Sequence, residues 1–265
     1  MPIKILIGMP IFEGLPVEQV QSILMIQRRA LESTPVVQVD FCMPTRTTLV
    51  QARNEIIREA VDGEYTHLCW LDDDNPVQDP YEAIASMLEF MESKKDCHVV
   101  SGLIKSRDDS HFTIYSSVGE IGQSTPQYEP FVPALTENPW VDQNTYEPFQ
   151  ADAIGFGFVL MDRESFTAVY KKYHGYPVSQ WLTAYTWIVV DQDKDWEQLC
   201  IVELADAFLY YQGKPMDGNL RFANLSENFL FRHRLTMIDD KYRPWILPNI
   251  QCFHIAKKYV SCDLK

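Results

Sequence analysis

The sequence predicts an α/β protein with a central, mostly parallel sheet, flanking helices and a smaller antiparallel portion. Over about the first hundred residues, apolar runs of strand length alternate with amphipathic segments of helix length. This alternation is typical of a parallel sheet with helices on both faces. Between residues 112 and 148 it gives way to short alternating stretches rich in Pro, Gln, Asn and aromatic residues, which indicate loops and antiparallel strands.

The first half is expected to contain four strands and three helices. The strands are predicted at 3–9, 36–43, 66–71 and 98–103, and the helices at 16–31, at 49–61 and from Asp79 or Pro80 onwards. Pro10 ends the first strand, and the polar residues before position 49 supply a cap for the second helix. The third helix is indicated by apolar residues at helical spacing, namely Ile84, Met87, Leu88 and Met91.

The second half is less regular. Its predicted elements are a strand at 151–161, a helix at 163–170, a helix at about 196–211, a helix at 226–235 and a last strand at 245–255. The segment 173–224 is unusually aromatic and reads as an insertion. Because no repeat and no low-complexity linker interrupts the chain, residues 1–265 are expected to form one domain.

Composition excludes several classes of protein. The chain has 265 residues, of which 46% are apolar and 12% aromatic, so it can build a substantial core. Lys and Arg total 23 against 37 Asp and Glu, a formal net charge of −14. Such a surface repels phosphate backbones, so no nucleic-acid partner is expected, although a locally basic cleft remains compatible with these totals.

The cysteines and the apolar runs predict the compartment. The six cysteines are scattered without a C-x-x-C pair, which indicates reduced thiols rather than a disulfide scaffold or a zinc site. The apolar run after Lys4 ends at Pro10, which is too short for a secretory signal. No stretch approaches the roughly 20 apolar residues that a membrane-spanning helix needs. We therefore expect a soluble, cytoplasmic protein.

The most informative segment is 66–76, where an apolar run stops on three consecutive carboxylates followed by Asn-Pro. The run reads as a buried strand, and Asn75-Pro76 as the turn that ends it. In an open α/β sheet, ligands bind outside the carboxyl ends of the strands. Three acids crowded there repel one another unless a cation or bound protons relieve them. Mg²⁺ prefers such oxygen ligands together with substrate phosphates, so the segment predicts a metal site for a phosphorylated ligand.

A structural interpretation of this segment stays open, because Asp and Asn also cap helices and make turns. Two named motifs do not fit. An EF-hand loop beginning at Asp72 would need Gly and Glu where the chain has Val77 and Ala83. The G-x-x-x-x-G-K-[ST] loop of Walker-type NTPases occurs nowhere in the chain.

Five segments follow one another in an order found in a known family. They are 8–13 after the first strand, 52–54, 71–74, 153–160, and 226–228 with 252–254 downstream. Together they resemble the GT-A glycosyltransferases, particularly the stand-alone enzymes of glycosyltransferase family 2. The resemblance implies the GT-A (nucleotide-diphospho-sugar transferase) fold. It also implies a nucleotide-sugar-binding half at 1–110 and an acceptor-side half at 111–265, with the insertion at about 173–224.

The resemblance implies a set of metal ligands. In that family a D-x-D element holds Mn²⁺ or Mg²⁺, which bridges the two phosphates of a nucleotide-sugar, and Asp72 and Asp74 match its two ends. Asp73 is expected to bind ribose or the sugar instead. Some GT-A enzymes bring a C-terminal histidine to the same ion, which implies His254 as a further ligand; the alternative is an ordinary core or surface histidine. A divalent ion stabilises the departing diphosphate as a Lewis acid.

The resemblance also assigns residues to the donor. Pro10, Ile11, Phe12 and Glu13 lie where the family places its base and ribose, and Phe12 either stacks on the base or belongs to the core. Arg53 is expected to face the base or the diphosphate, for which its forked guanidinium is suited, or else to form a surface salt bridge. Lys105, just after the fourth strand, is a further candidate for the donor sugar or phosphate.

For catalysis the resemblance points to Glu227. Inverting members usually carry Glu-Asp here, and one acid deprotonates the acceptor hydroxyl. This chain has Glu227-Asn228, and Asn cannot act as a base. The base is therefore predicted to be Glu227 or Asp152, unless the enzyme is of the retaining kind. The structural alternative is that Glu227 stabilises a helix dipole and that Asp152 ends a turn.

The function predicted from these residues is a metal-dependent transfer of a sugar from a UDP- or GDP-linked donor to a hydroxyl of a glycan or another acceptor. The aromatic segment 173–224 is expected to form an acceptor lid, a core or a contact in a homo-oligomer. Two alternatives stay open. One is a sugar-phosphate nucleotidyltransferase, although its Gly-rich basic loop is replaced here by Pro-Ile-Phe-Glu-Gly. The other is a catalytically inactive protein that binds carbohydrate or nucleotide.

Overall fold

The computed structural model describes the following parts of the chain: 2–11, 14–33, 37–105, 112–118, 127–130, 147–173, 186–190, 201–203, 210–211, 214–215, 221–225, 231, 235 and 238–252. Within these parts, the first hundred residues alternate strands and helices as predicted. No helix among them is long and apolar enough to cross a bilayer.

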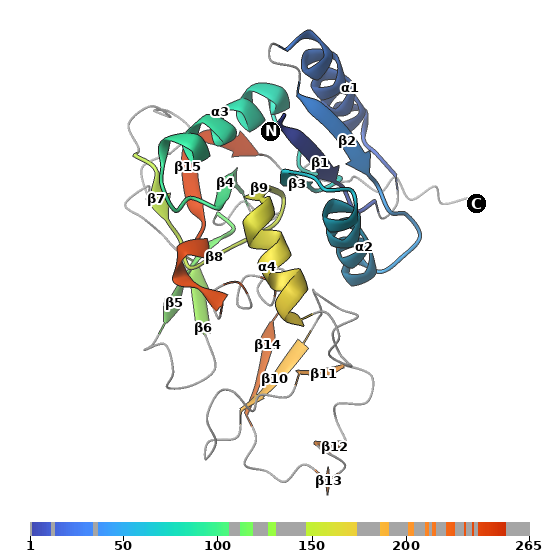
Figure 1. Ribbon diagram of the computed structural model, residues 1–265. Coiled ribbons are helices and arrows are strands. Elements are labelled where there is room, and N and C mark those ends of the chain that lie inside the picture. Colours follow the sequence, from blue (N-terminus) through green and yellow to red (C-terminus); the bar gives the residue numbers. More distant parts are fainter. Residues whose placement is uncertain are drawn as a thin grey trace, which may run out of the picture.

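A seven-stranded sheet forms the centre of the molecule (Figure 1). Its order across the sheet is β2 (Gln38–Cys42), β1 (Lys4–Gly8), β3 (His67–Leu71), β9 (Phe158–Asp162), β4 (Val99–Ile104), β15 (Trp245–Cys252) and β7 (Phe149–Gln150). Strands β2, β1, β3, β4 and β15 run in one direction, whereas β9 and β7 are antiparallel to their neighbours. The predicted α/β class, with a mostly parallel sheet and flanking helices, is confirmed.

Two helices cover each face of this sheet. Helices α1 (Val17–Glu32) and α3 (Pro80–Ser93) contact each other and share one apolar core with the sheet. Helices α2 (Leu49–Asp62) and α4 (Arg163–Tyr173) contact each other over the other core. The caps agree with the sequence, because Thr48 and Gln51 form a capping box and Asp79 caps α3.

The remaining strands are antiparallel, and among them only those within residues 112–148 were predicted to be so. Strands β5 (Ile114–Val118), β6 (Gln127–Pro130) and β8 (Ala153–Ile154) form one small sheet. Strands β10 (Thr186–Val190), β11 (Ile201–Glu203) and β14 (Arg221–Leu225) form another, beyond the C-terminal end of α4 in Figure 1. A pair of two-residue strands, β12 (Tyr210–Tyr211) and β13 (Lys214–Pro215), and the 3-10 helix Asp240–Tyr242 complete the described elements.

Two predicted elements were wrong. The strand expected at 151–161 is divided into β8 and β9, which belong to different sheets. The division falls at Gly155, where a Cβ would lie 2.9 Å from the Thr113 hydroxyl oxygen, so a close contact from elsewhere in the chain bends the segment. The helix expected at about 196–211 contains strands β11 and β12 instead, because its Ile-Val and Tyr-Tyr pairs favour extended backbone.

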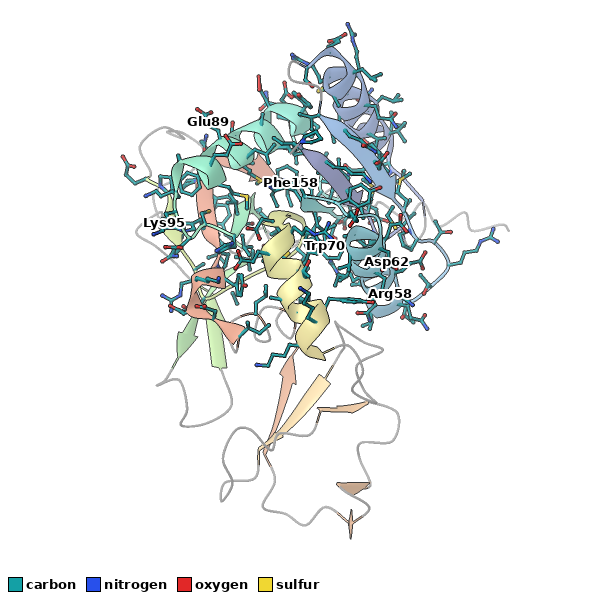
Figure 2. The ribbon with its side chains drawn as sticks, viewed as in Figure 1. Arg58, Asp62, Trp70, Glu89, Lys95 and Phe158 are labelled. Carbon is teal, nitrogen blue, oxygen red and sulfur yellow. The ribbon has the colours of Figure 1, made fainter. Side chains whose placement is uncertain are left out.

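The last two predicted elements can be compared over the described residues alone. The helix predicted at 226–235 is helical at Phe231 and Leu235, whereas 226–230 and 232–234 lie outside the described residues. The last strand ends at Cys252, and the chain beyond it is likewise outside them. Figure 2 shows Trp70 and Phe158 in the interior, while the labelled charged side chains lie at the surface, namely Arg58, Asp62, Glu89 and Lys95.

Candidate functional site

The strand order reverses between β1 and β3, because the chain passes from β1 to β2 on one side while β3 lies on the other. In α/β sheets, such a reversal opens a crevice at the carboxyl ends of the two strands, where ligands bind. Here the residues that follow β1 are Met9 and Pro10, and the residues that follow β3 are Asp72 to Asn75. We call residues 72–75 the acidic turn.

The backbone of Asp72 is held on both sides. Its N–H donates to the Gly157 carbonyl oxygen at 3.1 Å, which ties the turn to the start of β9. Its carbonyl oxygen accepts a hydrogen bond from Gln19 Nε2 at 2.9 Å and a longer one from the Asn75 N–H at 3.4 Å. The first residue of the acidic turn is therefore fixed from β9, from α1 and from within the turn itself.

The side chain of Asp72 is paired with a buried cation. Arg53, on α2, is only 1% exposed and donates from Nη2 to Asp72 Oδ1 at 3.1 Å, while the Asp72 side chain is 28% exposed. The Arg53 guanidinium carbon lies 5.2 Å from the ring centroids of both Trp70 and Phe156. The alternative of a surface salt bridge was wrong, because this ion pair is formed by a guanidinium inside the core.

The rest of the turn is buried as well. Asp73, Asp74 and Asn75 are all buried, and Asn75 Nδ2 donates to Asp74 Oδ1 at 3.3 Å. A Cβ at Gly157 would lie 2.7 Å from Asn75 Nδ2 and 3.1 Å from Ile104 Cδ1. Glycine is therefore required at 157 for β9 to pass this close to the turn.

The C-terminal ends of β4 and β15 lie at the same edge of the sheet as the acidic turn. Val77, which follows the acidic turn, forms an antiparallel bridge with Cys252 at the end of β15. The Lys105 N–H donates to the Cys252 carbonyl oxygen at 3.4 Å, and the Ile11 N–H donates to the Pro44 carbonyl oxygen at 3.0 Å. The structure thus brings Ile11, Lys105 and the acidic turn to one edge of the sheet.

Not every predicted site residue can be placed there. Phe12, Glu13, Glu227 and His254 lie outside the described residues. Asp152 lies between β7 and β8, and its Oδ1 is 3.2 Å from Nη2 of Arg243, just before the start of β15. Because β7 is four strands from β3 and pairs with the first residues of β15, Asp152 lies apart from the acidic turn, toward the opposite edge.

The residue types of the acidic turn suit a hard divalent cation. The turn offers carboxylate oxygens from three consecutive residues, the ligands that Mg²⁺ and Mn²⁺ prefer. Of these carboxylates, that of Asp72 is paired with Arg53 through one of its two oxygens. Asp72, through its second oxygen, and Asp74 are the residues that could hold such an ion.

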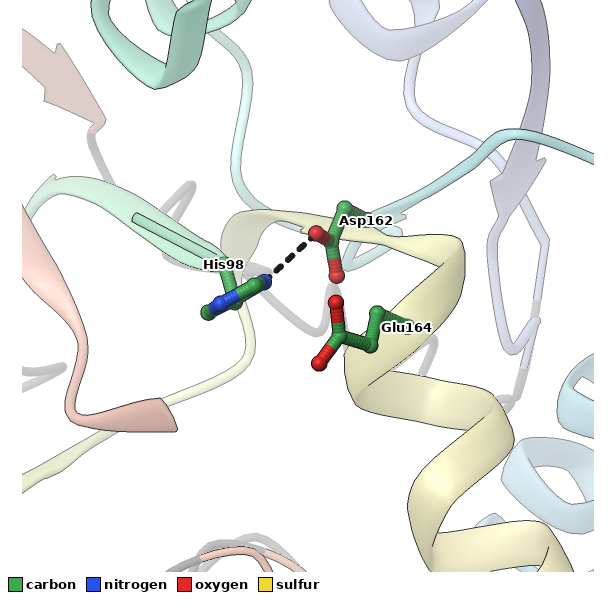
Figure 3. A group of neighbouring side chains, drawn as sticks. All are labelled: His98, Asp162 and Glu164. Carbon is green, nitrogen blue, oxygen red and sulfur yellow. Dashed lines mark hydrogen bonds and ion pairs between the residues drawn. The ribbon is translucent and has the colours of Figure 1, made fainter. Parts of the chain in front are cut away.

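A second group of ligand-type side chains was not predicted. His98 precedes β4, Asp162 ends β9 and Glu164 opens α4, and their ligand atoms all lie within 4.8 Å of one another (Figure 3). Because β9 is antiparallel to β3 and β4, this group lies at the edge of the sheet opposite the acidic turn. The sequence signal was weak, since His98 and Asp162 are 64 residues apart.

These three side chains already have protein partners. His98 Nδ1 lies 2.7 Å from Asp162 Oδ2, and Asp162 Oδ1 accepts from the Ser165 N–H at 2.9 Å, which caps α4. The Glu164 carboxylate accepts hydrogen bonds from Lys241 and from the Tyr242 hydroxyl. The hydrogen bond from Lys241 is the main cause of a lowered pKa of Glu164. The group is therefore accounted for as a junction between β4, β9 and α4.

Comparison with known proteins gives likenesses of fold only. No protein-family model and no curated protein matches the chain. Among solved structures, A197 from STIV is 12% identical, with a TM-score of 0.49, and the match covers 96% of this chain and 85% of that chain. GalNAc-T7, solved with UDP, GalNAc and Mn²⁺, is 12% identical, with a TM-score of 0.46; the match covers 96% of this chain but only 43% of that one.

A glycosyltransferase involved in the glycosylation of the major capsid of PBCV-1 is also 12% identical, with a TM-score of 0.33 over 66% of this chain and 69% of that chain. At these TM-scores, no residue role is transferred from the three proteins to this chain.

Proposed function

We propose that the protein is a metal-dependent glycosyltransferase that moves a sugar from a UDP- or GDP-linked donor to a hydroxyl acceptor. The observation that carries this proposal is the acidic turn at the strand reversal, where Asp72 is held by β9, α1 and α2 and is followed by the buried residues Asp73 and Asp74. Consecutive carboxylates at such a position suit a dication and the phosphates it accompanies.

In this proposal, Asp72 and Asp74 hold Mn²⁺ or Mg²⁺, together with His254, and Asp73 binds ribose or the sugar. The bound ion supplies Lewis-acid stabilisation of the diphosphate as it leaves. Lys105 and residues 10–13 bind the donor. Arg53 serves the donor side through Asp72, because its guanidinium is buried behind that carboxylate rather than open to a ligand.

The proton of the acceptor hydroxyl needs a base if the enzyme inverts. Glu227 is proposed for this role because it is the acid of the Glu-Asn pair that can accept a proton. Asp152 is the second candidate from the sequence, but it pairs with Arg243 toward the opposite edge of the sheet from the acidic turn, so Glu227 is preferred. Replacing Glu227 by Gln should lower turnover far more than donor affinity, whereas an equal loss in both would argue against a base.

The decisive experiment measures donor binding by calorimetry. A panel of nucleotide-sugars is titrated into the protein with and without Mn²⁺, and again into Asp74→Ala. We expect one class of donor to bind only with Mn²⁺ and to lose that binding in Asp74→Ala. The exposed Glu89→Gln serves as a control for the loss of one negative charge. Donor binding that changes neither on removal of Mn²⁺ nor in Asp74→Ala would contradict the proposal.

The reaction products separate the remaining alternatives. Release of free nucleoside diphosphate indicates sugar transfer or donor hydrolysis, whereas release of pyrophosphate from a nucleoside triphosphate and a sugar phosphate indicates nucleotidyl transfer. If neither product forms although the donor binds, the protein is a binding protein that does not turn over its ligand.

A further inference from the structure

Gln19 is a buried polar residue that contacts the acidic turn from another element. It lies in the first turn of α1, its exposed fraction is 0%, and it lies on the helix face that packs on the sheet, with Ser22, Ile26 and Ala30. Its Nε2 donates to the Asp72 carbonyl oxygen at 2.9 Å. This is the shorter of the two hydrogen bonds that this carbonyl receives from described residues.

The other end of the same amide is not satisfied. Across the part of the chain that the structure describes, no donor meets Gln19 Oε1, although the atom is inaccessible to solvent. A buried acceptor without a donor destabilises a fold, and an apolar side chain of similar size would avoid that penalty. The packing of α1 alone would therefore favour leucine at this position. Leucine, however, could not donate the hydrogen bond to the Asp72 carbonyl oxygen.

We propose that Gln19 is a positioning residue that holds the acidic turn in the arrangement its cation requires. This inference rests on the proposed function, since it concerns the same site. Gln19 acts through the backbone of Asp72, whose side chain is in turn fixed by Arg53. Three elements therefore contact Asp72. Helix α1 binds its carbonyl oxygen, α2 binds its carboxylate, and the residue before β9 binds its N–H.

Without Gln19, the Asp72 carbonyl would keep the bond of 3.4 Å from the Asn75 N–H. The peptide after Asp72 could then rotate, and Asp74 would follow it. Partners of this kind orient metal ligands, and their loss typically lowers metal affinity by about 10- to 100-fold. Without the Gln19 amide, the protein would lose one hydrogen bond, but it would also no longer bury an acceptor without a donor. The free energy of unfolding should therefore change little or rise.

The test compares Gln19→Leu with the unmodified protein. Binding of Mn²⁺, alone and with UDP, is measured by calorimetry, and thermal unfolding is followed without Mn²⁺. We expect the Kd for Mn²⁺ to rise at least tenfold while Tm stays the same or increases. Gln19→Met, which is unbranched like Gln, repeats the test if the leucine variant fails to fold.

Ser22→Ala is the matched control. Ser22 is buried one turn further along the same face of α1, and its hydroxyl donates to the Glu18 carbonyl oxygen of its own helix at 3.0 Å. A general disturbance of α1 would therefore affect both variants, whereas a positioning role affects only Gln19→Leu. We expect Ser22→Ala to keep the Kd for Mn²⁺ within twofold.

The outcomes separate this inference from the function on which it rests. If the unmodified protein does not bind Mn²⁺, the proposed function fails and the role of Gln19 fails with it. If the unmodified protein binds Mn²⁺ and the folded Gln19→Leu variant binds it equally well, Gln19 is not a positioning residue and the proposed function stands. A lower Tm with unchanged affinity would likewise assign Gln19 to the stability of the core alone.

Discussion

At the scale of single residues, the acidic turn depends on side chains that contribute no ligand atoms to the proposed ion. Arg53 was predicted to be near the donor, and the structure places it behind Asp72. Gln19 was not singled out, although a signal was present: it occupies a position on the apolar face of a predicted helix, at helical spacing from Ile23 and Ile26. A polar residue on such a face needs a partner, and sequence alone could not name Asp72.

The ion pair beneath the turn predicts unequal effects for two of the acids. Asp72→Ala removes the carboxylate that pairs with the buried Arg53, and breaking a buried pair on one side destabilises by about 3 kcal/mol. Asp74→Ala leaves the ion pair between Arg53 and Asp72 in place and should lower the free energy of unfolding by clearly less. Urea denaturation of both variants without metal measures the difference. The double variant Asp72→Ala/Arg53→Met should recover part of the loss, and equal effects of the two single changes would contradict this account.

At the scale of elements, most of the fold followed from apolar periodicity, whereas the position of β9 did not. The four strands and three helices predicted in the first half are all present within a few residues of their predicted bounds. Periodicity describes which face of an element is buried, but not its neighbours in the sheet. Strand β9 lies between β3 and β4 through pairing with strands far from it in the sequence. The group of His98, Asp162 and Glu164, here called the His98 group, forms only because β9 lies there.

The start of α4 predicts that the His98 group is structural. Asp162→Ala removes both the cap of α4 and the partner of His98, and loss of such a cap costs about 1 kcal/mol. Asp162→Asn keeps an oxygen for the cap and should be milder. Thermal unfolding compares the two variants, and calorimetry with Mn²⁺ serves as the second readout. We expect the affinity for Mn²⁺ to be unchanged in Asp162→Ala. A large loss of affinity would indicate that the metal site lies at the His98 group and not at the acidic turn.

At the scale of the whole molecule, the core contains ionisable groups that must stay neutral. Burial raises the pKa of the Cys69 thiol to about 12 and is the main cause that raises the pKa of Cys97 to about 12 and that of Tyr65 to about 12. Among the described residues, Cys69, Cys97 and Cys252 are buried free thiols. The burial of these thiols, unlike their number, could be known only from the packing of the sheet.

These groups predict a loss of stability at alkaline pH. In the unfolded chain the thiols ionise near pH 9, whereas in the folded protein those of Cys69 and Cys97 stay protonated to about pH 12. Their contribution to stability is therefore complete below pH 9 and is lost as the pH rises toward 12. Cys69→Val removes one such group, so its free energy of unfolding, measured in urea between pH 7 and pH 11, should fall less steeply. Parallel curves for the variant and the unmodified protein would refute this explanation.

Strand β9 has a consequence for how the two edges of the sheet depend on each other. The Gly157 carbonyl oxygen, just before the strand, holds Asp72, and Asp162 at its far end holds His98. Since side chains alternate between the two faces of a sheet, a slip of β9 by one residue would turn Asp162 away from His98 and withdraw the carbonyl from Asp72 in the same step. The contacts at both edges therefore require the same register of β9, and a chain that pairs this strand one residue out of register loses both contacts.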